Sequence, residues 1–335
     1  MSLDVLAAGS PLDHVVSHVV FHLGELPVTN HMIMAGVAGV LMLLIFPPLF
    51  ASQKAGAPSG MRNFFEAILQ FLREDVFRPA LKEHTDRFTP FLWTVFFFIL
   101  FCNLLGFIPL NEFIIVATGG NAGMFAHVGG TATGNIATTA ALALCAFFFI
   151  HGSGIWQVAG ELMSGTYGHH GQESHALTHP VETSLAGAPR AGMALPSGHG
   201  MGAVSAIASS PFYYLWNFAP HLFKPKAGES PVGWIADLTV WGLLVLLELV
   251  GSLIKPFALC MRLFANMIAG HIVLAVLAGL IPVTMGILMQ LGIGVPVTAM
   301  SLMIRLLELF VSFLQAYIFT FLTTLFIAAA VAPEH

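Results

Sequence analysis

The stretch LELVGSLIKPFALCMRLFANMIAGHIVLAVLAGL, residues 247–280, decides the fold that we expect for this chain. It belongs to an apolar run that extends from Trp234 to about Leu280, and a second run covers about 284–330. A helix that crosses a bilayer at right angles needs only about 20 residues. Each run is therefore either two membrane crossings or one long, strongly tilted helix, and Pro282 and Pro296 are expected to bracket the turn between them.

The composition of the whole chain supports a membrane location. Of the 335 residues, 57% are hydrophobic and only 9% are charged, whereas soluble domains carry about 25% charged residues. The three cysteines, Cys102, Cys145 and Cys260, are scattered through apolar runs. Their odd number and spacing argue against a disulfide framework or a thiolate metal site. The composition therefore predicts a polytopic membrane protein.

Three shorter spans are predicted before the long runs, at about 31–50, 89–110 and 135–155. Lys and Arg are concentrated between the first two of them, which makes this connection cytoplasmic and places the N-terminus outside and the C-terminus in the cytoplasm. Within the connection, residues at about 62–78 have apolar positions at helical spacing, which predicts an amphipathic helix on the membrane surface. The N-terminal segment has no basic start and no long apolar core, so it is not expected to be a cleavable signal.

The predicted fold is thus an all-α polytopic membrane protein with about five membrane-embedded helices and one amphipathic surface helix. The last two helices are expected to be long and strongly tilted and to form a hairpin. The chain is expected to divide into four parts. They are an extracytoplasmic segment (1–30), three spans with the amphipathic helix (31–155), a His/Gly-rich loop or insertion with an interfacial segment (156–233), and the helical hairpin (234–335).

Arg262 is the residue of the first long run that is hardest to explain without a functional role. An arginine near the middle of a bilayer costs about 2.5–3.5 kcal/mol on insertion scales, and ionisable groups in this position mark ion pathways. On a helix, Glu248 lies within about 40° of Arg262 and Asn266 lies one turn beyond it, whereas His271 faces the opposite side. Glu248 is alternatively an interfacial residue whose charge reaches the membrane surface, and His271 is alternatively a hydrogen-bonded core histidine.

The second long run carries Glu308 and Gln315, which share one helix face within about 20°. Either residue alone is explained by a hydrogen bond to a neighbouring helix, and Arg305 could form an ordinary intrahelical pair with Glu308. Small residues also recur along the first run, from Gly251 to Gly270. They permit either close internal packing or the passage of a partner helix.

Taken together, the polar motifs resemble a known family. MRLFANMIAGH (261–271), with Glu and Lys-Pro upstream in LELVGSLIKPFALCMRLFAN (247–266), resembles the signature of subunit a of the F-type ATP synthase. LELFVSFLQAYIFTFLTTLFIA (307–328) is similar to the last helix of that family, and FCNLLGFIPL and TGNIATTAALAL are similar to its second and third spans. The resemblance covers nearly the whole chain except the first thirty residues and the insertion at about 156–209.

The resemblance implies a proton-channel stator that couples proton flow to rotation and ATP synthesis without being catalytic itself. Arg262 would face the rotating c-ring, with Asn266 and Gln315 as polar neighbours. His271 and Glu308 would relay protons in one half-channel, and Glu248 would line the other. Asn103 and Asn135 would be further lining residues.

The same resemblance implies the partners and the location. The partners would be the c-ring, the subunit b peripheral stalk and the lipid bilayer, in an energy-coupling membrane such as a bacterial inner membrane. No cofactor and no nucleic acid are expected, and no nucleotide is expected to bind directly because the chain has no Walker-type loop.

Two features depart from the family pattern. The insertion contains four weak candidates for metal ligands, His169, His170, His175 and His179, and they suggest a metal-ion transporter as the alternative function. A buried arginine would repel such a cargo. A structural membrane subunit with no ion path is a further alternative, but it leaves Arg262, His271 and Glu308 unexplained. The second departure is Arg305, which stands where a neutral residue is expected.

Overall fold

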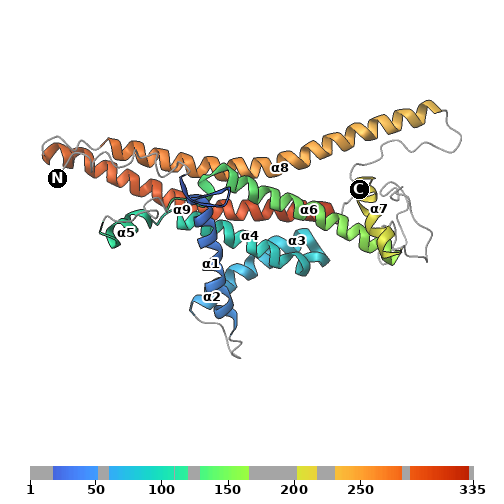
Figure 1. Ribbon diagram of the computed structural model, residues 1–335, viewed down its shortest axis with the longest axis horizontal. Helices are drawn as coiled ribbons and strands as arrows, with labels where there is room; N and C mark the ends of the chain where they lie inside the picture. The colour runs from blue at the N-terminus through green and yellow to red at the C-terminus, as the bar shows by residue number, and fades with distance from the viewer. Residues whose placement is uncertain are drawn as a thin grey trace, which may run out of the picture. The chain divides into compact units, whose positions relative to one another are not determined.

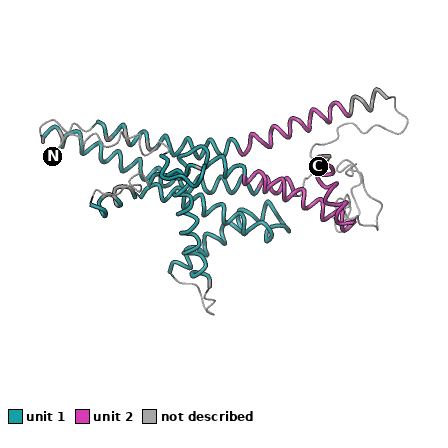
Figure 2. The backbone as a smooth tube through the Cα atoms, in the orientation of Figure 1, with its two compact units in different colours: residues 1–144, 257–324 teal, residues 145–256, 325–335 magenta. Residues whose placement is uncertain are grey.

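The part of the protein that its computed structural model describes is almost entirely helical (Figure 1). The structure describes residues 18–51, 60–108, 110–119, 129–165, 202–216, 231–280 and 287–331. It forms two compact units, which Figure 2 distinguishes by colour. Unit 1 comprises residues 1–144 and 257–324, and unit 2 comprises residues 145–256 and 325–335.

Five helical stretches in the described part of the chain are long and apolar enough to cross a membrane. This confirms the prediction of an all-α polytopic membrane protein. The stretches are α1 (Asn30–Ala51), a continuous helical segment that ends in α4 (Thr85–Leu105), α6 (Ile136–Ser164), α8 (Pro231–Gly279) and α9 (Ile287–Val331). The shorter helices are α5 (Leu110–Ala117), η5 (Ala132–Gly134) and α7 (Ala203–Trp216).

Each of the two long apolar runs forms a single helix. The helix α8 has 49 residues and continues through Pro256, and α9 has 45 residues and continues through Pro296. The expectation that Pro296 borders the turn is therefore wrong, and Pro282 lies outside the described residues. A proline removes one backbone hydrogen bond, but any other break in a lipid-exposed segment would leave more backbone groups unpaired. Continuing the helix is the less costly solution.

In unit 1, α1 packs against the end of α4 and against η5. Buried apolar side chains from all three elements form one cluster, consisting of Met34, Ala38, Cys102, Leu105 and Ala132. A short antiparallel hairpin of β1 (Val19–Leu23) and β2 (Leu26–Thr29) precedes α1. Its two-residue turn begins with Gly24, which has a φ of 66°, a conformation that glycine adopts without strain. The sequence did not predict this hairpin.

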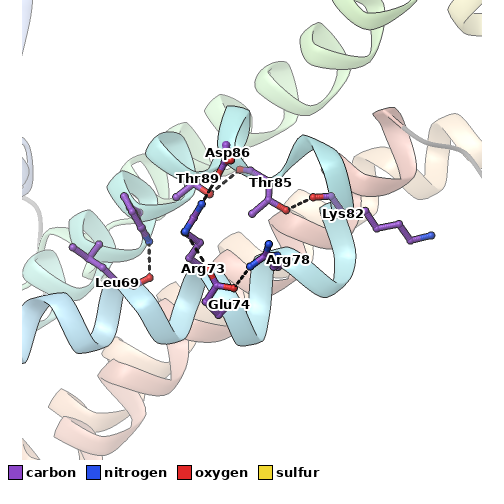
Figure 3. Close-up of polar contacts among 9 residues, drawn as sticks. Leu69, Arg73, Glu74, Arg78, Lys82, Thr85, Asp86 and Thr89 are labelled. Atoms are coloured by element: carbon purple, nitrogen blue, oxygen red, sulfur yellow. Dashed lines mark hydrogen bonds and ion pairs between the residues drawn. The ribbon is translucent and has the colours of Figure 1, made fainter.

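A charged turn leads from the amphipathic helix α2 (Met61–Phe71) into α4. The helix α2 continues into the π-helical segment η2 (Leu72–Phe77), the helix α3 (Arg78–Leu81) and the turn η3 (Lys82–His84). Arg73 donates to Asp86 at 2.6 Å and also to Glu74, while the Thr85 hydroxyl donates to the carbonyl oxygen of Lys82. Figure 3 draws these contacts. These contacts hold the chain reversal at Lys82, whose φ is 49°.

In unit 2, the second half of α6 packs against α7. Val158, Leu162 and Ala206 form its buried apolar cluster. Nearby, His151 Nδ1 and the Tyr214 hydroxyl lie 2.9 Å apart and share a hydrogen bond. The helix α7 follows the His-rich segment in the sequence and covers the end of the predicted insertion and the start of the predicted interfacial segment.

Candidate functional site

Arg262 lies on an exposed face of α8. Among the residues that the structure describes, it makes no hydrogen bond and no ion pair. Ala258, Ala265 and Ala269 are exposed as well, and positions 258, 262, 265 and 269 follow the 3.6-residue repeat of one helix face. We call these four residues the arginine stripe. It presents one permanent cation between side chains small enough for another helix to approach closely.

The opposite face of α8 is directed into unit 1. Leu259, Leu263 and Met267 are buried there, and Cys260 contacts the hydroxyl of Thr139 on α6 at 3.2 Å. The small residues of the arginine stripe are therefore not used for packing within the described part of the chain.

Glu308 on α9 lies against the backbone of α8 at Gly270. A Cβ atom built on Gly270 would stand 1.9 Å from Oε1 of Glu308 and 2.8 Å from its Cδ, so a side chain at position 270 would force the Glu308 carboxylate to move. Asn266, one turn before Gly270, is half-buried. The structure thus brings Glu308 next to the polar segment of α8, and it does so because residue 270 has no side chain.

Arg305 does not pair with Glu308 in the structure. Arg305 is exposed and Glu308 is half-buried, and no ion pair joins these two described residues. The intrahelical pair that the sequence left open is therefore not formed, and the carboxylate of Glu308 is not occupied by the neighbouring guanidinium.

Two further predicted residues, Gln315 and Asn103, are buried polar side chains in the same part of unit 1 as Glu308. Gln315 is buried on α9, two turns after Glu308. Asn103, at the end of α4, is fully buried and donates to the backbone carbonyl of Ser312 at 3.4 Å. It also accepts a hydrogen bond of 2.8 Å from Thr133. Thr133 and Ser312 were not singled out from the sequence, since isolated hydroxyl residues carry little signal without their neighbours.

The other predicted lining residues have different surroundings. Asn135 caps α6, because its Oδ1 accepts a hydrogen bond of 2.7 Å from the N–H of Ala137. Glu248 is half-buried on α8 and belongs to unit 2, as does Lys255, whose Nζ lies 5.1 Å from the centroid of the Phe326 ring.

For the remaining predicted residues, the structure describes no side chain. The backbone of His271 is helical, but its side chain is not described. The four insertion histidines, His169, His170, His175 and His179, also lie outside the described residues. Within the described residues, no group of three or more His, Cys, Asp or Glu side chains is arranged to hold a metal ion.

Comparisons with known proteins relate the chain to one family. The family described as ATP synthase A chain matches residues 32–181 and 192–328. Subunit a of ATP synthase from Chloroherpeton thalassium is 34% identical over 92% of the chain and 68% of its own length. Its counterpart from Myxococcus xanthus is 33% identical over 93% of the chain and 75% of its own length. The second form of the subunit from Chlorobaculum tepidum is 31% identical, and the chain spans 64% of its length.

Proposed function

Because the chain belongs to the ATP synthase A chain family, we propose that it is the proton-conducting stator subunit of that synthase. Its membrane-spanning helices would provide two half-channels, and Arg262 would face the rotating c-ring between them. The observation that carries this proposal is the arginine stripe, which exposes an unpaired cation among small side chains on a helix long enough to cross a membrane.

The proposed mechanism begins with a carboxyl group on each c subunit. When rotation brings that carboxyl next to Arg262, the cation favours its ionised form, and the proton leaves through one half-channel. After the carboxyl has passed Arg262, it takes a proton from the other half-channel and returns to the lipid in neutral form. Membrane potential supplies about 2.3 kcal/mol per charge per 100 mV for this cycle.

A second role of Arg262 follows from its chemistry. A guanidinium remains protonated in proteins and does not relay a proton. Its charge also repels a proton that would move directly between the half-channels. In our proposal, protons therefore cross the membrane only while they are bound to the carboxyl groups of the rotating c-ring.

The other polar residues are assigned to the half-channels. Glu308, held at Gly270, would exchange protons on one side together with His271, and Gln315, Asn266 and Asn103 would line that path. Glu248 would line the other path. Asn135 contributes through its cap on α6, which holds the start of that helix.

We further propose the c-ring and the subunit b stalk as partners, in a bacterial inner membrane or a similar energy-coupling membrane. The N-terminus would lie outside and the C-terminus in the cytoplasm. The chain would not catalyse ATP chemistry itself.

The test is ATP-driven proton pumping by the whole synthase reconstituted in liposomes, with Arg262→Ala compared with Arg305→Ala. Both arginines are exposed on long helices and make no ion pair among the described residues, so Arg305→Ala is a matched control. We expect Arg262→Ala to abolish pumping and Arg305→Ala to retain it. Unchanged pumping by an assembled Arg262→Ala complex would overturn the proposal.

A further inference from the structure

His31, at the start of α1, is a buried histidine that the proposed mechanism does not use. Only 1% of its surface is exposed. Its Nδ1 lies 2.8 Å from the backbone carbonyl oxygen of Thr131, so Nδ1 carries the proton and donates it. Nε2 is buried and has no hydrogen-bond partner among the described residues. An imidazole with one nitrogen fixed and the other unused is an expensive group to bury without a role.

The surroundings of His31 lead toward Glu308. Thr131 lies two residues before Thr133, and Thr133 donates to Asn103, which donates to the carbonyl of Ser312. Ser312 in turn bonds the backbone carbonyl of Glu308, one turn away on α9, at 2.9 Å. We call His31, Thr131, Thr133, Asn103 and Ser312 the polar seam. Three hydrogen bonds join its members, and Thr131 and Thr133 are linked only along the chain.

The polar seam joins four elements within unit 1. It begins at the start of α1, passes the turn that contains η5 and the end of α4, and reaches α9. Four of its side chains, those of Asn103, Thr131, Thr133 and Ser312, are at most 3% exposed. The side chains of Thr133, Asn103 and Ser312 are satisfied by their own hydrogen bonds, and among the described side chains of the seam only Nε2 of His31 is buried without a partner. Nε2 of His31 is therefore the atom of the seam that is left to bind a proton.

We propose that the polar seam is the entrance to the half-channel that serves Glu308, and that His31 is its outermost proton-exchanging group. This inference rests on the proposed function. Nε2 takes a proton that has entered the protein from the aqueous phase on the side where α1 begins. The resulting imidazolium releases that proton to water held along the seam, and the histidine returns to the neutral form with Nδ1–H still bonded to Thr131.

Histidine suits this position because its charge changes near neutral pH. The titratable groups on the elements around His31 are few in the described part of the chain. His18 precedes the hairpin and its backbone bonds Asn30, and Cys102 on α4 belongs to the apolar cluster with Met34. Neither supplies a carboxylate that would hold a proton on His31 permanently, so exchange remains possible.

The experiment uses the whole synthase in liposomes and two substitutions that cannot titrate. His31→Asn places an amide N–H near the position of Nδ1 and can preserve the bond to Thr131. His31→Gln places its amide near Nε2 instead. The exposed His22 of the hairpin provides the matched control, His22→Asn. ATP synthesis driven by an imposed potential is measured against the pH on the side where α1 begins, with assembly of each complex checked.

We expect the wild-type rate to fall as that pH rises, because the imidazole of His31 then takes up a second proton less often. Both His31 variants should lose about fivefold in rate and lose this pH dependence, as a missing proton-transfer group would cause. A His31→Asn complex with wild-type rate and pH profile would mean that His31 only forms a structural hydrogen bond with Thr131 and does not transfer protons. Slower variants that keep the wild-type pH profile would also overturn the inference.

Arg262→Ala in the same assay separates the two proposals. If it abolishes coupled synthesis while the His31 variants behave as wild type, the proposed function stands and the entrance is elsewhere. If Arg262→Ala has no effect, the proposed function itself fails.

Discussion

At the scale of single residues, the arrangement depends on which side chains are absent as much as on which are present. Gly270 lets the carboxylate of Glu308 lie against the backbone of α8, and the alanines of the arginine stripe leave room around a cation. Arg305 lacks such surroundings, since Leu302, Leu306 and Leu309 are exposed near it on α9. This difference is why we assign the coupling role to one exposed arginine and not to the other.

Substitution of Gly270 tests the position of Glu308. In Gly270→Ala the new methyl group would overlap Oε1 of Glu308, so the carboxylate must move away from α8. A displacement of about 1 Å in a reacting group can cost up to about 100-fold in rate, and we expect at least a tenfold loss of ATP-driven pumping.

Gly251→Ala is the control for that substitution. Gly251 lies on the same helix, but a Cβ atom there would meet nothing within 4 Å. We expect this variant to pump normally. Equal pumping by both assembled variants would mean that the contact between Gly270 and Glu308 does not matter for proton exchange.

At the scale of elements, the turn before α4 gives a pH-dependent contribution to stability. The hydrogen bond from Arg73 lowers the pKa of Asp86, which lies before the apolar part of the helix. A lowered pKa in the folded state stabilises the fold above the ordinary value, and this contribution is lost as pH falls through the lowered value. The effect is small because Asp86 is 79% exposed and surface pairs are screened by solvent.

We expect the wild-type melting temperature in detergent to fall more than that of Asp86→Asn when the pH drops below about 4. Glu83→Gln is the control, because Glu83 is exposed in the same segment and forms no ion pair among the described residues. It should follow the wild-type curve. Parallel curves for wild type and Asp86→Asn would show that this ion pair does not stabilise the turn.

The helices also show how far sequence reasoning reaches. The apolar runs predicted the five spans because the bilayer sets a minimum length for each crossing. Pro296 misled the prediction of where the turn lies, because α9 continues through it and a helix in lipid keeps more backbone groups paired than a break would. The π-helical segment η2 had no sequence signal that we recognised.

Only part of the predicted site could be derived from the sequence, because contacts between helices leave no pattern along the chain. Spacing along one helix predicts which residues share a face, as for Arg262 and Asn266. Contacts between helices depend on the tertiary fold: Glu308 meets Gly270, and His31 meets Thr131 at a distance of 100 residues in the sequence. A lone histidine at the start of a span gave no reason to look for that partner.

At the scale of the whole molecule, our account requires one orientation in the membrane. Leu23 in the hairpin is 69% exposed and Glu83 is exposed in the charged turn, and we place them on opposite sides. Single cysteines would be introduced as Leu23→Cys and Glu83→Cys after replacement of the three native cysteines. In sealed inside-out vesicles, we expect an impermeant thiol reagent to label position 83 and not position 23. The reverse pattern would invert the topology and the side from which the polar seam opens.

The central claim is that Arg262 forces protons to travel with the ring, and passive proton flux through a locked rotor tests it most directly. The synthase is reconstituted in liposomes, the rotor is cross-linked to the stator, and flux is driven by an imposed membrane potential. We expect no flux through the wild-type complex and through Arg305→Ala, but measurable flux through Arg262→Ala, because the barrier between the half-channels is gone. Absence of flux through a fully assembled, locked Arg262→Ala complex would contradict the account.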